Sequence, residues 1–475
     1  MTAPLWTRAE AQAATGGHAR GGDWVAGGVS IDSRTLEPGD LFVALAGPNH
    51  DGHDFATAAL ARGASACLVE RVAAGFSADA PLLIVEDTML ALRRLAEAAR
   101  RRSQARIVAV TGSVGKTGTK EMLSRALAAA GPTHASAGNL NNEIGVPLSL
   151  ARLPAAARYA VFEVGMNHPG EITPLSRLIR PDVVVVTTVE AAHLEFFAST
   201  AEIAAAKAEI FAGVPSDGAA VLPRDNRHYG LLRDAARDAG IRQIVSFGAH
   251  IEADARLLHA SAGDGTTQVA ALIGEVALNY RLDVAGRHWA TNSLAVLLAA
   301  RAVGVAPAAA AAALAGMSAP KGRGARATLP WGDGILIVID EAYNANPASM
   351  RAAIAALAAS RPGTGGRRIA ALGDMLELGE AAPRLHAALA PAIVEAEIDL
   401  VITAGPLMKN LYDALPVERR GAHAADSVEA ATLVKGLVAA GDVVMVKGSA
   451  GSRMGRIVTA LEEAAAPLRP AANGG

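Results

Sequence analysis

The chain has 475 residues, too many for a single hydrophobic core, and we expect two to four domains. Its net charge of −2 gives no basic footprint for nucleic acid or for an anionic membrane surface. No apolar run is long enough to span a bilayer, and the first residues lack the apolar stretch of a secretory signal. The single cysteine, Cys67, excludes an intramolecular disulfide. These features predict a cytoplasmic, multidomain α/β protein without membrane insertion, and we expect a monomer.

The first segment, residues 1–104, is predicted to form a small mixed α/β domain. Short apolar runs at 40–45, 66–70 and 82–85 predict strands that are separated by turns. The charged run 89–102 predicts a helix that connects this segment to the next one.

The second segment, residues 105–319, is predicted to form a central P-loop ATPase domain. Apolar strands are expected at 107–110, 159–164 and 182–188, and helical stretches alternate with them. The alanine-rich run 306–315 also predicts a helix. Strands that alternate with helices predict a parallel sheet.

The sequence Thr-Gly-Ser-Val-Gly-Lys-Thr at 111–117 follows the first of these strands and precedes a helical stretch. Gly112 and Gly115 allow sharp turns, so that successive backbone N–H groups and a helix N-terminus can point at phosphate. Lys116 would reach the β- and γ-phosphates, and the Thr117 hydroxyl would hold Mg²⁺. The first glycine of a full P-loop is missing. An ordinary strand–helix turn with an exposed lysine is therefore the alternative.

The third segment, residues 320–475, repeats the α/β pattern and is predicted to be a Rossmann-like domain. The predicted hinge is the stretch 316–334, which contains several Gly and Pro residues and includes the beginning of this segment. The strands expected in this segment are 335–340, 369–372, 400–404 and 443–446.

The second segment contains three chemistry-bearing residues, two of them on or just after strands and one in a helical run. Glu163 ends a strand, where a buried carboxylate needs a partner or a metal. His193 follows another strand, and Lys207 lies in the helical run 199–211. Taken singly, they also fit a strand-end carboxylate near water, a loop histidine and a solvated helix lysine.

Further polar runs occur in the rest of the chain, one where a helix is expected to begin and another after the strand that ends at Asp340. They are 286–292, the residues after Asp340, 343–347, 373–379 and 447–453. Polar residues at strand ends in two α/β domains indicate a site that closes between domains.

Seven of these motifs occur together and in order, and the chain resembles the Mur ligases of peptidoglycan synthesis. The motifs are Thr-Gly-Ser-Val-Gly-Lys-Thr (111–117), Gly-Asn-Leu-Asn-Asn-Glu-Ile-Gly-Val-Pro (138–147), Glu-Val-Gly-Met-Asn-His-Pro-Gly-Glu-Ile (163–172), Ala-His-Leu-Glu (192–195), Tyr-Asn-Ala-Asn-Pro (343–347), Gly-Asp-Met-Leu-Glu-Leu-Gly (373–379) and Val-Lys-Gly-Ser (446–449). Near the N-terminus, 30–34, 39–44 and 51–53 resemble the family's uridine-nucleotide-binding domain. The resemblance is strongest to the member that adds D-alanyl-D-alanine.

The resemblance implies roles for individual residues. ATP contacts are implied for Gly112, Ser113, Gly115, Lys116, Thr117, Gly118, Asn292 (adenine), Arg323 (γ-phosphate), Asp340 (ribose) and Tyr343. Two Mg²⁺ sites are implied, the first at Thr117 and the second at Glu163, His193 and Lys207, with Lys207 carried as a carbamate. Implied catalytic residues are Lys116, Glu163, His193, Lys207 and Arg323. Substrate contacts are implied for Ser33, Arg34, His53, Asn139 (near the reacting carboxylate), Asn142, Asn344, Asn346, Lys447 and Ser449.

Two positions depart from the family pattern. Val114 replaces a usually polar residue, and Gly118 replaces the threonine that usually follows Lys-Thr. Backbone groups can hold phosphate without either side chain, so we expect the ATP site to survive, with affinity for ATP weakened by roughly 1 kcal/mol through a lost hydrogen bond.

The implied reaction joins UDP-N-acetylmuramoyl-tripeptide to D-alanyl-D-alanine through an acyl phosphate made from ATP. The open alternatives are a sibling ligase, either the one that adds the third residue or a folylpolyglutamate synthetase, and a non-catalytic ATP-binding regulator. The missing Asp-Asn-Pro-Arg amino-acid clamp argues against the first sibling, and the uridine-type segment argues against the second. A regulator would not need Glu163, His193 and Lys207 together.

Overall fold

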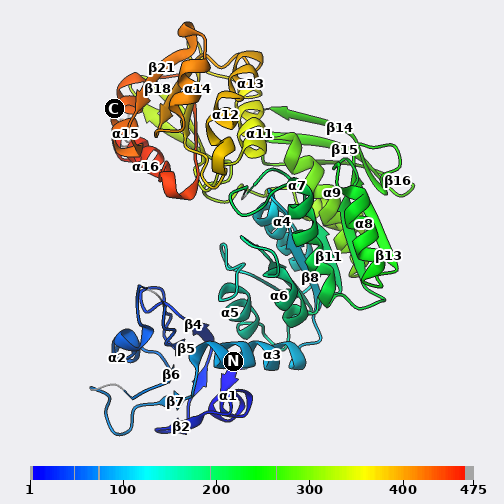
Figure 1. Ribbon diagram of the computed structural model, residues 1–475, viewed down its shortest axis with the longest axis vertical. Coiled ribbons are helices and arrows are strands. Elements are labelled where there is room, and N and C mark those ends of the chain that lie inside the picture. The colour runs from blue at the N-terminus through cyan, green and yellow to red at the C-terminus, as the bar shows by residue number, and fades with distance from the viewer. Residues whose placement is uncertain (1–3, 48, 73–74, 193, 264, 466–475) are drawn as a thin grey trace, which may run out of the picture.

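The computed structural model describes residues 4–47, 49–72, 75–192, 194–263 and 265–465. Within these ranges, three main sheets follow one another along the chain and along the length of the molecule (Figure 1). Every helix of the described ranges is too short or too polar to cross a bilayer.

The sheet nearest the N-terminus has five strands in the order β2-β7-β6-β5-β4. Strands β4 to β7 are parallel and β2 is antiparallel, while β1 and β3 form a separate pair. Helices α1 and α3 cover one face and α2 covers the other. The elements are β1 (Trp6–Thr7), α1 (Arg8–Thr15), β2 (His18–Arg20), β3 (Val25–Ala26), β4 (Gly28–Ser30), β5 (Asp40–Val43), η1 (Gly52–Phe55), α2 (Ala56–Ala61), β6 (Ala66–Val69), β7 (Leu82–Ile84) and α3 (Thr88–Arg102).

Helix α3 connects this sheet to the central one, as the charged run predicts. Asp87 caps its first turn by accepting a hydrogen bond from the Leu90 N–H, and three arginines in the last turn suit the helix dipole. Its apolar face buries Leu92 and Leu95 against the N-terminal core and Ala96 against the central core. The helix therefore couples the two sheets through shared packing.

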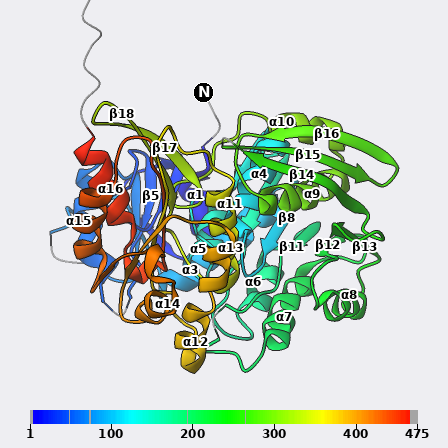
Figure 2. The ribbon, with the colours of Figure 1, turned by 90° about the horizontal axis from the view of Figure 1, so that it is seen from above.

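The central sheet has nine strands in the order β16-β15-β14-β13-β12-β11-β8-β10-β9. Helices α4, α9 and α10 cover one face, and α5, α6, α7 and α8 cover the other (Figure 2). The elements are β8 (Arg106–Thr111), α4 (Lys116–Ala128), β9 (Thr133–Ala135), α5 (Gly145–Ala151), β10 (Tyr159–Glu163), α6 (Ile172–Ile179), β11 (Val183–Val186), α7 (Thr200–Ala208), η2 (Glu209–Gly213), β12 (Ala219–Pro223), α8 (Tyr229–Asp238), β13 (Gln243–Gly248), β14 (Ala255–Gly263), β15 (Thr266–Ile273), β16 (Val276–Leu282), α9 (Arg287–Ala302) and α10 (Pro307–Ala313).

The predicted parallel sheet is confirmed for β8 to β13, and the structure adds an antiparallel extension made of β14, β15 and β16. These strands alternate buried and less buried residues, because one face lies on α9 while the other is open. These strands were not predicted, because their residues alternate in burial and do not form continuous apolar runs.

The C-terminal sheet has six strands in the order β17-β18-β22-β19-β20-β21, parallel except for β17. Helices α11 to α14 cover one face, and α15 and α16 cover the other. The elements are β17 (Ala325–Trp331), β18 (Gly334–Glu341), α11 (Pro347–Ala358), β19 (Arg368–Gly373), η3 (Gly379–Ala381), α12 (Ala382–Ala387), α13 (Ala390–Glu395), β20 (Leu400–Ala404), α14 (Lys409–Ala414), η4 (Val417–Arg419), β21 (Arg420–Ala424), α15 (Ser427–Leu437), β22 (Val443–Lys447), η5 (Ala450–Ser452) and α16 (Gly455–Ala464).

Strand β17 occupies much of the predicted hinge 316–334, which is a correction to that prediction. It pairs with β18 along its whole length, so residues 325–331 are not a flexible hinge. Prolines and glycines indicated a loop here, but this edge strand tolerates Pro330 because only one of its sides pairs.

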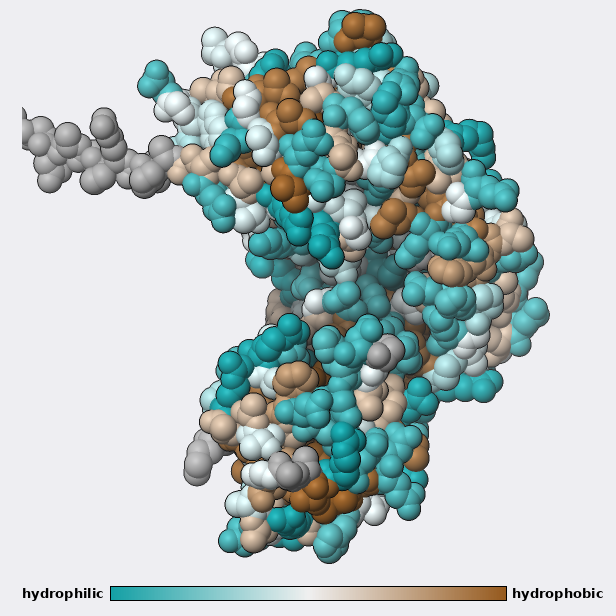
Figure 3. Space-filling model, turned by 60° about the vertical axis from the view of Figure 1, so that its left-hand side comes forward, coloured by the Kyte–Doolittle hydropathy of each residue, from teal (hydrophilic) through white to brown (hydrophobic). Residues whose placement is uncertain are grey.

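The carboxyl ends of central strands β8 and β10 face those of C-terminal strands β18 and β22, and a deep hollow lies between them. The space-filling view shows this hollow about halfway along the molecule, with mainly hydrophilic residues around it (Figure 3). Ligands of parallel α/β sheets bind at such edges. Loops of the two segments also touch, because the Glu195 N–H, in the loop after β11, donates to the Glu377 carbonyl, in the loop after β19, at 3.2 Å.

Candidate active site

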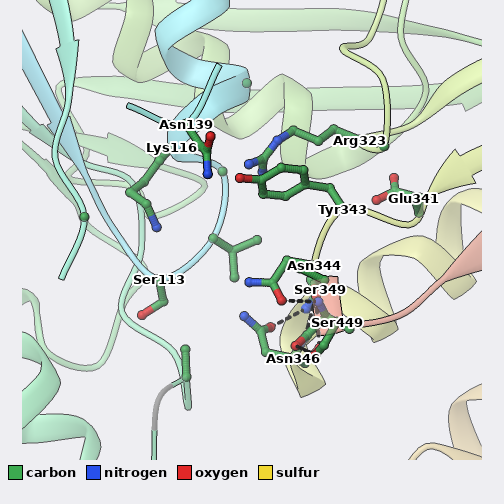
Figure 4. A pocket seen from close by; sticks show the side chains of 18 of the residues that line it. Ser113, Lys116, Asn139, Arg323, Glu341, Tyr343, Asn344, Asn346, Ser349 and Ser449 are labelled. Carbon is green, nitrogen blue, oxygen red and sulfur yellow. Dashed lines mark hydrogen bonds between the residues drawn. The ribbon is translucent and has the colours of Figure 1, made fainter. Parts of the chain in front are cut away.

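A cavity of about 370 Å³ lies between the central and C-terminal sheets. Ser113, Lys116 and Asn139 border it from the central segment, and Arg323 and Tyr343 border it from the C-terminal one (Figure 4). Two segments that are far apart in sequence therefore build one site, as the strand-end polar residues predict.

The 111–117 motif has the predicted strand–turn–helix geometry. Gly112 and Gly115 adopt φ values of +149° and +85°, and Gly115 caps α4, which begins at Lys116. A Cβ on Gly112 would lie 1.9 Å from Thr187 Oγ1, so no other residue fits there. The backbone N–H groups at the start of α4 are thus available to an anion.

The Ser113 side chain holds this turn to the neighbouring strand. Its hydroxyl donates to the Glu190 carbonyl at 3.1 Å and accepts from the Glu190 N–H at 3.0 Å, while its own N–H donates to the Thr188 carbonyl at 2.8 Å. Ser113 therefore fixes the loop as well as bordering the cavity.

The presence of glycine at position 118, where the family usually has threonine, has a steric cause in this chain. A Cβ at this position would lie 2.7 Å from ring atoms of Trp289, which is buried in the core beneath α4. The threonine usual in the family would not fit beside this tryptophan.

Lys116 is partly buried and donates from Nζ to the Gly112 carbonyl at 2.7 Å. Burial lowers its pKa, whereas the nearby Glu163 carboxylate raises it and Arg323 lowers it further. The ammonium thus lies at the phosphate loop among the charged groups predicted for this site.

Glu163 is 1% exposed and holds two other segments together. Its carboxylate accepts from Thr117 Oγ1 at 2.7 Å and from Asn141 Nδ2 at 2.8 Å. A buried carboxylate beside a hydroxyl offers the hard oxygen donors that Mg²⁺ prefers. Across the described ranges, no three His, Cys, Asp or Glu side chains form a preassembled metal cluster. Beside Glu163 and Thr117, further Mg²⁺ ligands are left to ATP, substrate, water, Lys207 and the predicted ligand His193, which lies outside the described residues.

Lys207 is 2% exposed, so the interpretation as a solvated helix lysine is wrong. Its Nζ lies 3.4 Å from Met166 Sδ, and among the described residues no carboxylate pairs with it. Burial lowers its pKa well below the usual value, and the Lys116 charge adds to that effect. A neutral, nucleophilic amine is therefore favoured at this position. His193, predicted beside it, lies outside the described residues.

Arg323 and Tyr343 form a stacked pair on the C-terminal wall, with the guanidinium carbon 3.9 Å from the ring centroid. Asp340 is buried and accepts from the Gly322 and Ala342 N–H groups at 2.9 and 3.1 Å. It is not among the residues that border this cavity. Asp340 thereby fixes the loop that carries Arg323, and its ribose contact stays a prediction.

Lys447 is buried and donates to the Asn344 carbonyl at 2.9 Å and to Glu341 Oε2 at 3.4 Å. Burial lowers its pKa, and the Glu341 carboxylate raises it. Asn344, like Lys447, borders the cavity. The predicted substrate contacts Lys447 and Asn344 are thus near one another.

Asn346 and Ser449 also border the cavity but are engaged with protein groups. Asn346 caps α11 by accepting from the Ser349 N–H, and Ser449 Oγ accepts from the Leu376 N–H and donates to the Ala345 carbonyl (Figure 4). These bonds fix the C-terminal wall, so any substrate contact would use what remains of their polar groups.

A second cavity of about 320 Å³ continues from the phosphate loop toward the central sheet. Gly115, His288, Asn292 and Glu341 border both cavities, and Phe247 borders the second. Burial lowers the pKa of His288, which favours its neutral form. The second cavity thus offers an amide, a neutral imidazole and an aromatic ring beside the phosphate loop.

The three predicted uridine contacts lie in the N-terminal segment, and none of them borders the two cavities above. Arg34 is exposed and pairs with Asp32, whose pKa falls to about 2 because of that guanidinium. Ser33 is partly exposed. His53 is buried, with Nδ1 2.6 Å from Asp51 and Nε2 accepting from the Glu70 N–H. His53 therefore has no ring nitrogen free for a ligand.

Three site residues were missed by the sequence analysis: Asn141, Glu341 and His288. Asn141 lies inside the 138–147 motif, but Asn142 was chosen instead. The Asn142 side chain caps α5 by accepting from the Gly145 N–H. Which of these two adjacent asparagines points at Glu163 depends on the backbone conformation of the loop, and the motif alone does not fix that.

Three family models match the chain: "Mur ligase middle domain" at 110–300, "Mur ligase, glutamate ligase domain" at 322–450, and "Mur ligase family, catalytic domain" at 26–100. The UDP-N-acetylmuramoyl-tripeptide–D-alanyl-D-alanine ligase of Escherichia coli is 38% identical over 94% of this chain and 96% of its own length. A crystal structure of MurF from Acinetobacter baumannii is 30% identical, with a TM-score of 0.83, over 97% of this chain and 99% of that one.

MurF from Thermotoga maritima, solved in complex with ADP, is 28% identical, with a TM-score of 0.76, over 92% of this chain and 97% of that one. Matches of this extent cover all three sheets and the loops that border the cavity. The chain belongs to the Mur ligase family.

Proposed function

We propose that this protein uses ATP to join D-alanyl-D-alanine to the terminal carboxylate of UDP-N-acetylmuramoyl-tripeptide, releasing ADP and phosphate. The E. coli relative bears the name of this activity and aligns over nearly its whole length. The observation that carries the proposal is the cavity between the two sheets, where Lys116 and Asn139 face Arg323 and Asn344.

ATP fits with its phosphates at the start of α4 and its base in the second cavity. The backbone N–H groups after Gly115 suit the phosphates, and Lys116 neutralises their charge. Asn292 and His288 border the way into the second cavity and suit the polar edge of a purine. This placement puts the γ-phosphate in the cavity bordered by Arg323.

The first step brings two anions together, the substrate carboxylate and the γ-phosphate. A carboxylate oxygen attacks phosphorus, the bond to the β–γ bridging oxygen breaks, and ADP leaves. Lys116 and Arg323 stabilise the charge on the transferred group from opposite walls. Two Mg²⁺ ions, the first held by Thr117 and the second by Glu163, His193 and Lys207, would supply further charge neutralisation.

In the second step, the free amine of the dipeptide attacks the acyl carbon, and phosphate leaves with the C–O bond electrons. The amine loses its proton and an amide forms. Water would hydrolyse the acyl phosphate first, so the reaction needs an enclosed site. A cavity whose walls come from two sheets can close when the C-terminal sheet moves about the segment before β17.

We infer that Lys207 reacts with CO₂ to form a carbamate that serves the second Mg²⁺. Burial without a carboxylate partner among the described residues favours the neutral amine that this reaction needs. The amine nitrogen forms a bond to the CO₂ carbon and loses one proton to solvent, and the product is an anion with oxygen donors, which suits a hard cation. Lys207 lies close enough to Lys116 for the two charges to interact, and this position suits a metal that serves both ATP and the substrate.

Phosphate release measured with each substrate omitted in turn tests the proposal. Turnover should require ATP, Mg²⁺, the UDP-linked tripeptide and D-alanyl-D-alanine together. The sibling that adds the third residue would instead turn over a UDP-linked dipeptide with a single amino acid. Folate with glutamate is the matched assay for the other sibling, and ATP turnover without any acceptor would indicate a regulator. A monomeric state and a cytoplasmic location remain predictions.

A further inference from the structure

One buried cation near the site has no part in the reaction described above. Lys120 lies one turn after Lys116 on α4, and its side chain is 1% exposed. It borders neither cavity of the candidate site, so it does not face ATP or the acyl acceptor. A lysine buried this fully is costly unless oxygen atoms surround its ammonium.

The oxygen partners of Lys120 lie mainly in the loop that carries the asparagines. Nζ donates to the Ser136 carbonyl at 2.8 Å and lies 3.5 Å from the Gly138 carbonyl. Its third partner is Glu121 Oε1 at 2.5 Å, on a side chain that is 41% exposed. The ammonium therefore holds both ends of a three-residue turn, and Asn139 is the next residue.

The other end of the same loop is held by the candidate metal ligand Glu163. Asn141 Nδ2 donates to the Glu163 carboxylate at 2.8 Å, and the Asn141 carbonyl accepts from the Gly165 N–H at 2.8 Å. Ser136 Oγ accepts from the Glu163 N–H at 3.3 Å. Asn139 thus lies between two anchored points and borders the cavity opposite Arg323 (Figure 4).

Helix α4 links both anchors to the phosphate loop. Thr117 and Lys120 are three residues apart and so lie on one side of the helix. Thr117 Oγ1 donates to Glu163 at 2.7 Å, while Lys120 binds the beginning of the loop. One helix therefore carries Lys116 in its first turn and Lys120 in its second. Through Lys120, it fixes the position of the asparagine loop relative to Lys116.

We propose that Lys120 is a positioning residue that holds Asn139 in register with Lys116, so that the acyl substrate's carboxylate meets the γ-phosphate. This inference rests on the proposed function, because Asn139 is the predicted contact of that carboxylate. Lys120 touches neither substrate, and it acts through the backbone of residues 136–138. Its loss should harm the use of the UDP-linked substrate and spare the binding of nucleotide.

The test compares the wild type with Lys120→Met, which has an unbranched side chain of similar length and no charge. We expect kcat/KM for UDP-N-acetylmuramoyl-tripeptide to fall roughly 10- to 100-fold, the range typical of misplaced catalytic groups. The Kd of ADP, measured by calorimetry without the UDP-linked substrate, should change by less than about twofold, since the start of α4 is untouched. Equal losses in both quantities would overturn the proposal and make Lys120 a structural residue.

Glu121→Gln is the matched control, since it removes the negative charge of the exposed partner of Lys120 and leaves both carbonyl contacts. We expect its kcat/KM to stay within about twofold of the wild type. Lys120→Arg keeps the charge and can fold if Lys120→Met does not. Its bulkier head group should displace the 136–138 turn and give the same split between substrate use and ADP binding. An Arg variant that loses ADP binding in parallel would also contradict the proposal.

A double-mutant cycle with Asn139→Ala gives the sharpest comparison. If Lys120 acts through Asn139, the double variant should be no slower than the slower single variant. If the fold-loss of kcat/KM in the double variant equalled the product of the two single losses, Lys120 would act independently of Asn139, which contradicts the inference. Failure of the proposed function would look different, because the wild type itself would then be inactive with D-alanyl-D-alanine.

Discussion

Replacing Lys207 by methionine should separate its catalytic contribution from its contribution to stability. Methionine has a similar length and no charge, and it can pack beside Met166, whose sulfur is 3.4 Å from Nζ. The substitution removes a buried amine that has no carboxylate partner among the described residues, so the fold should not weaken. Turnover should nevertheless fall at least about 100-fold, or roughly 2.7 kcal/mol of transition-state stabilisation, if the carbamate serves the second Mg²⁺.

Phosphate release and thermal unfolding would be measured on the same preparations, in buffer with and without bicarbonate. Lys435→Met is the matched control, because Lys435 is an exposed helical lysine on α15. A short carboxylic acid in excess should restore part of the activity by replacing the lost anion. Near wild-type turnover in Lys207→Met, or a parallel loss of activity and melting temperature, would refute the reasoning.

Three further perturbations test other parts of the site. Arg323→Ala should lower turnover roughly 100-fold and change stability by less than about 1 kcal/mol, because its described contact is the stacking on Tyr343; a loss of melting temperature that matches the loss of activity would contradict this. Gly118→Ala should cost about 1–3 kcal/mol of unfolding free energy, measured with urea, because its Cβ would lie 2.7 Å from the Trp289 ring, and an unchanged midpoint would count against the packing. Burial lowers the pKa of His386, so the histidine of the unfolded state takes up a proton at a higher pH than that of the folded state. The free energy of unfolding should therefore fall as the pH drops below about 6.5, by at most about 1.4 kcal/mol per pH unit. His386→Gln should flatten that part of the pH dependence, and an unaltered slope between pH 7 and 5 would show that other groups cause it.

The sequence predicts the order of the three sheets and the phosphate loop well, because both depend on local patterns. A strand, a glycine turn and a helix must adjoin for Lys116 to lie at a helix start, and the structure has this arrangement. The antiparallel β14–β16 extension was missed because its strands alternate instead of forming apolar runs. Strand β17 was hidden because glycines flank it on both sides and Pro330 lies within it.

The site was predicted less completely, since side-chain direction depends on tertiary contacts. The motif containing Asn141 and Asn142 was recognised, yet only the structure shows that Asn141 reaches Glu163 while Asn142 caps a helix. Asp340, at the end of its strand, was predicted to contact the ribose of ATP. Its neighbour Glu341 is the residue that borders both cavities. Burial of Lys207 could not be predicted from an alanine-rich helix alone, because the pattern has no distinct apolar face.

Isotope transfer tests the proposed reaction most directly. The UDP-linked tripeptide would carry ¹⁸O in its terminal carboxylate and react with ATP, Mg²⁺ and D-alanyl-D-alanine, and phosphate and peptide would be analysed by mass spectrometry. An acyl phosphate predicts that one labelled oxygen leaves the carboxylate with the phosphate, and that one UDP-linked pentapeptide forms for each ADP. Phosphate free of label, or ADP formed without the pentapeptide, would contradict the account.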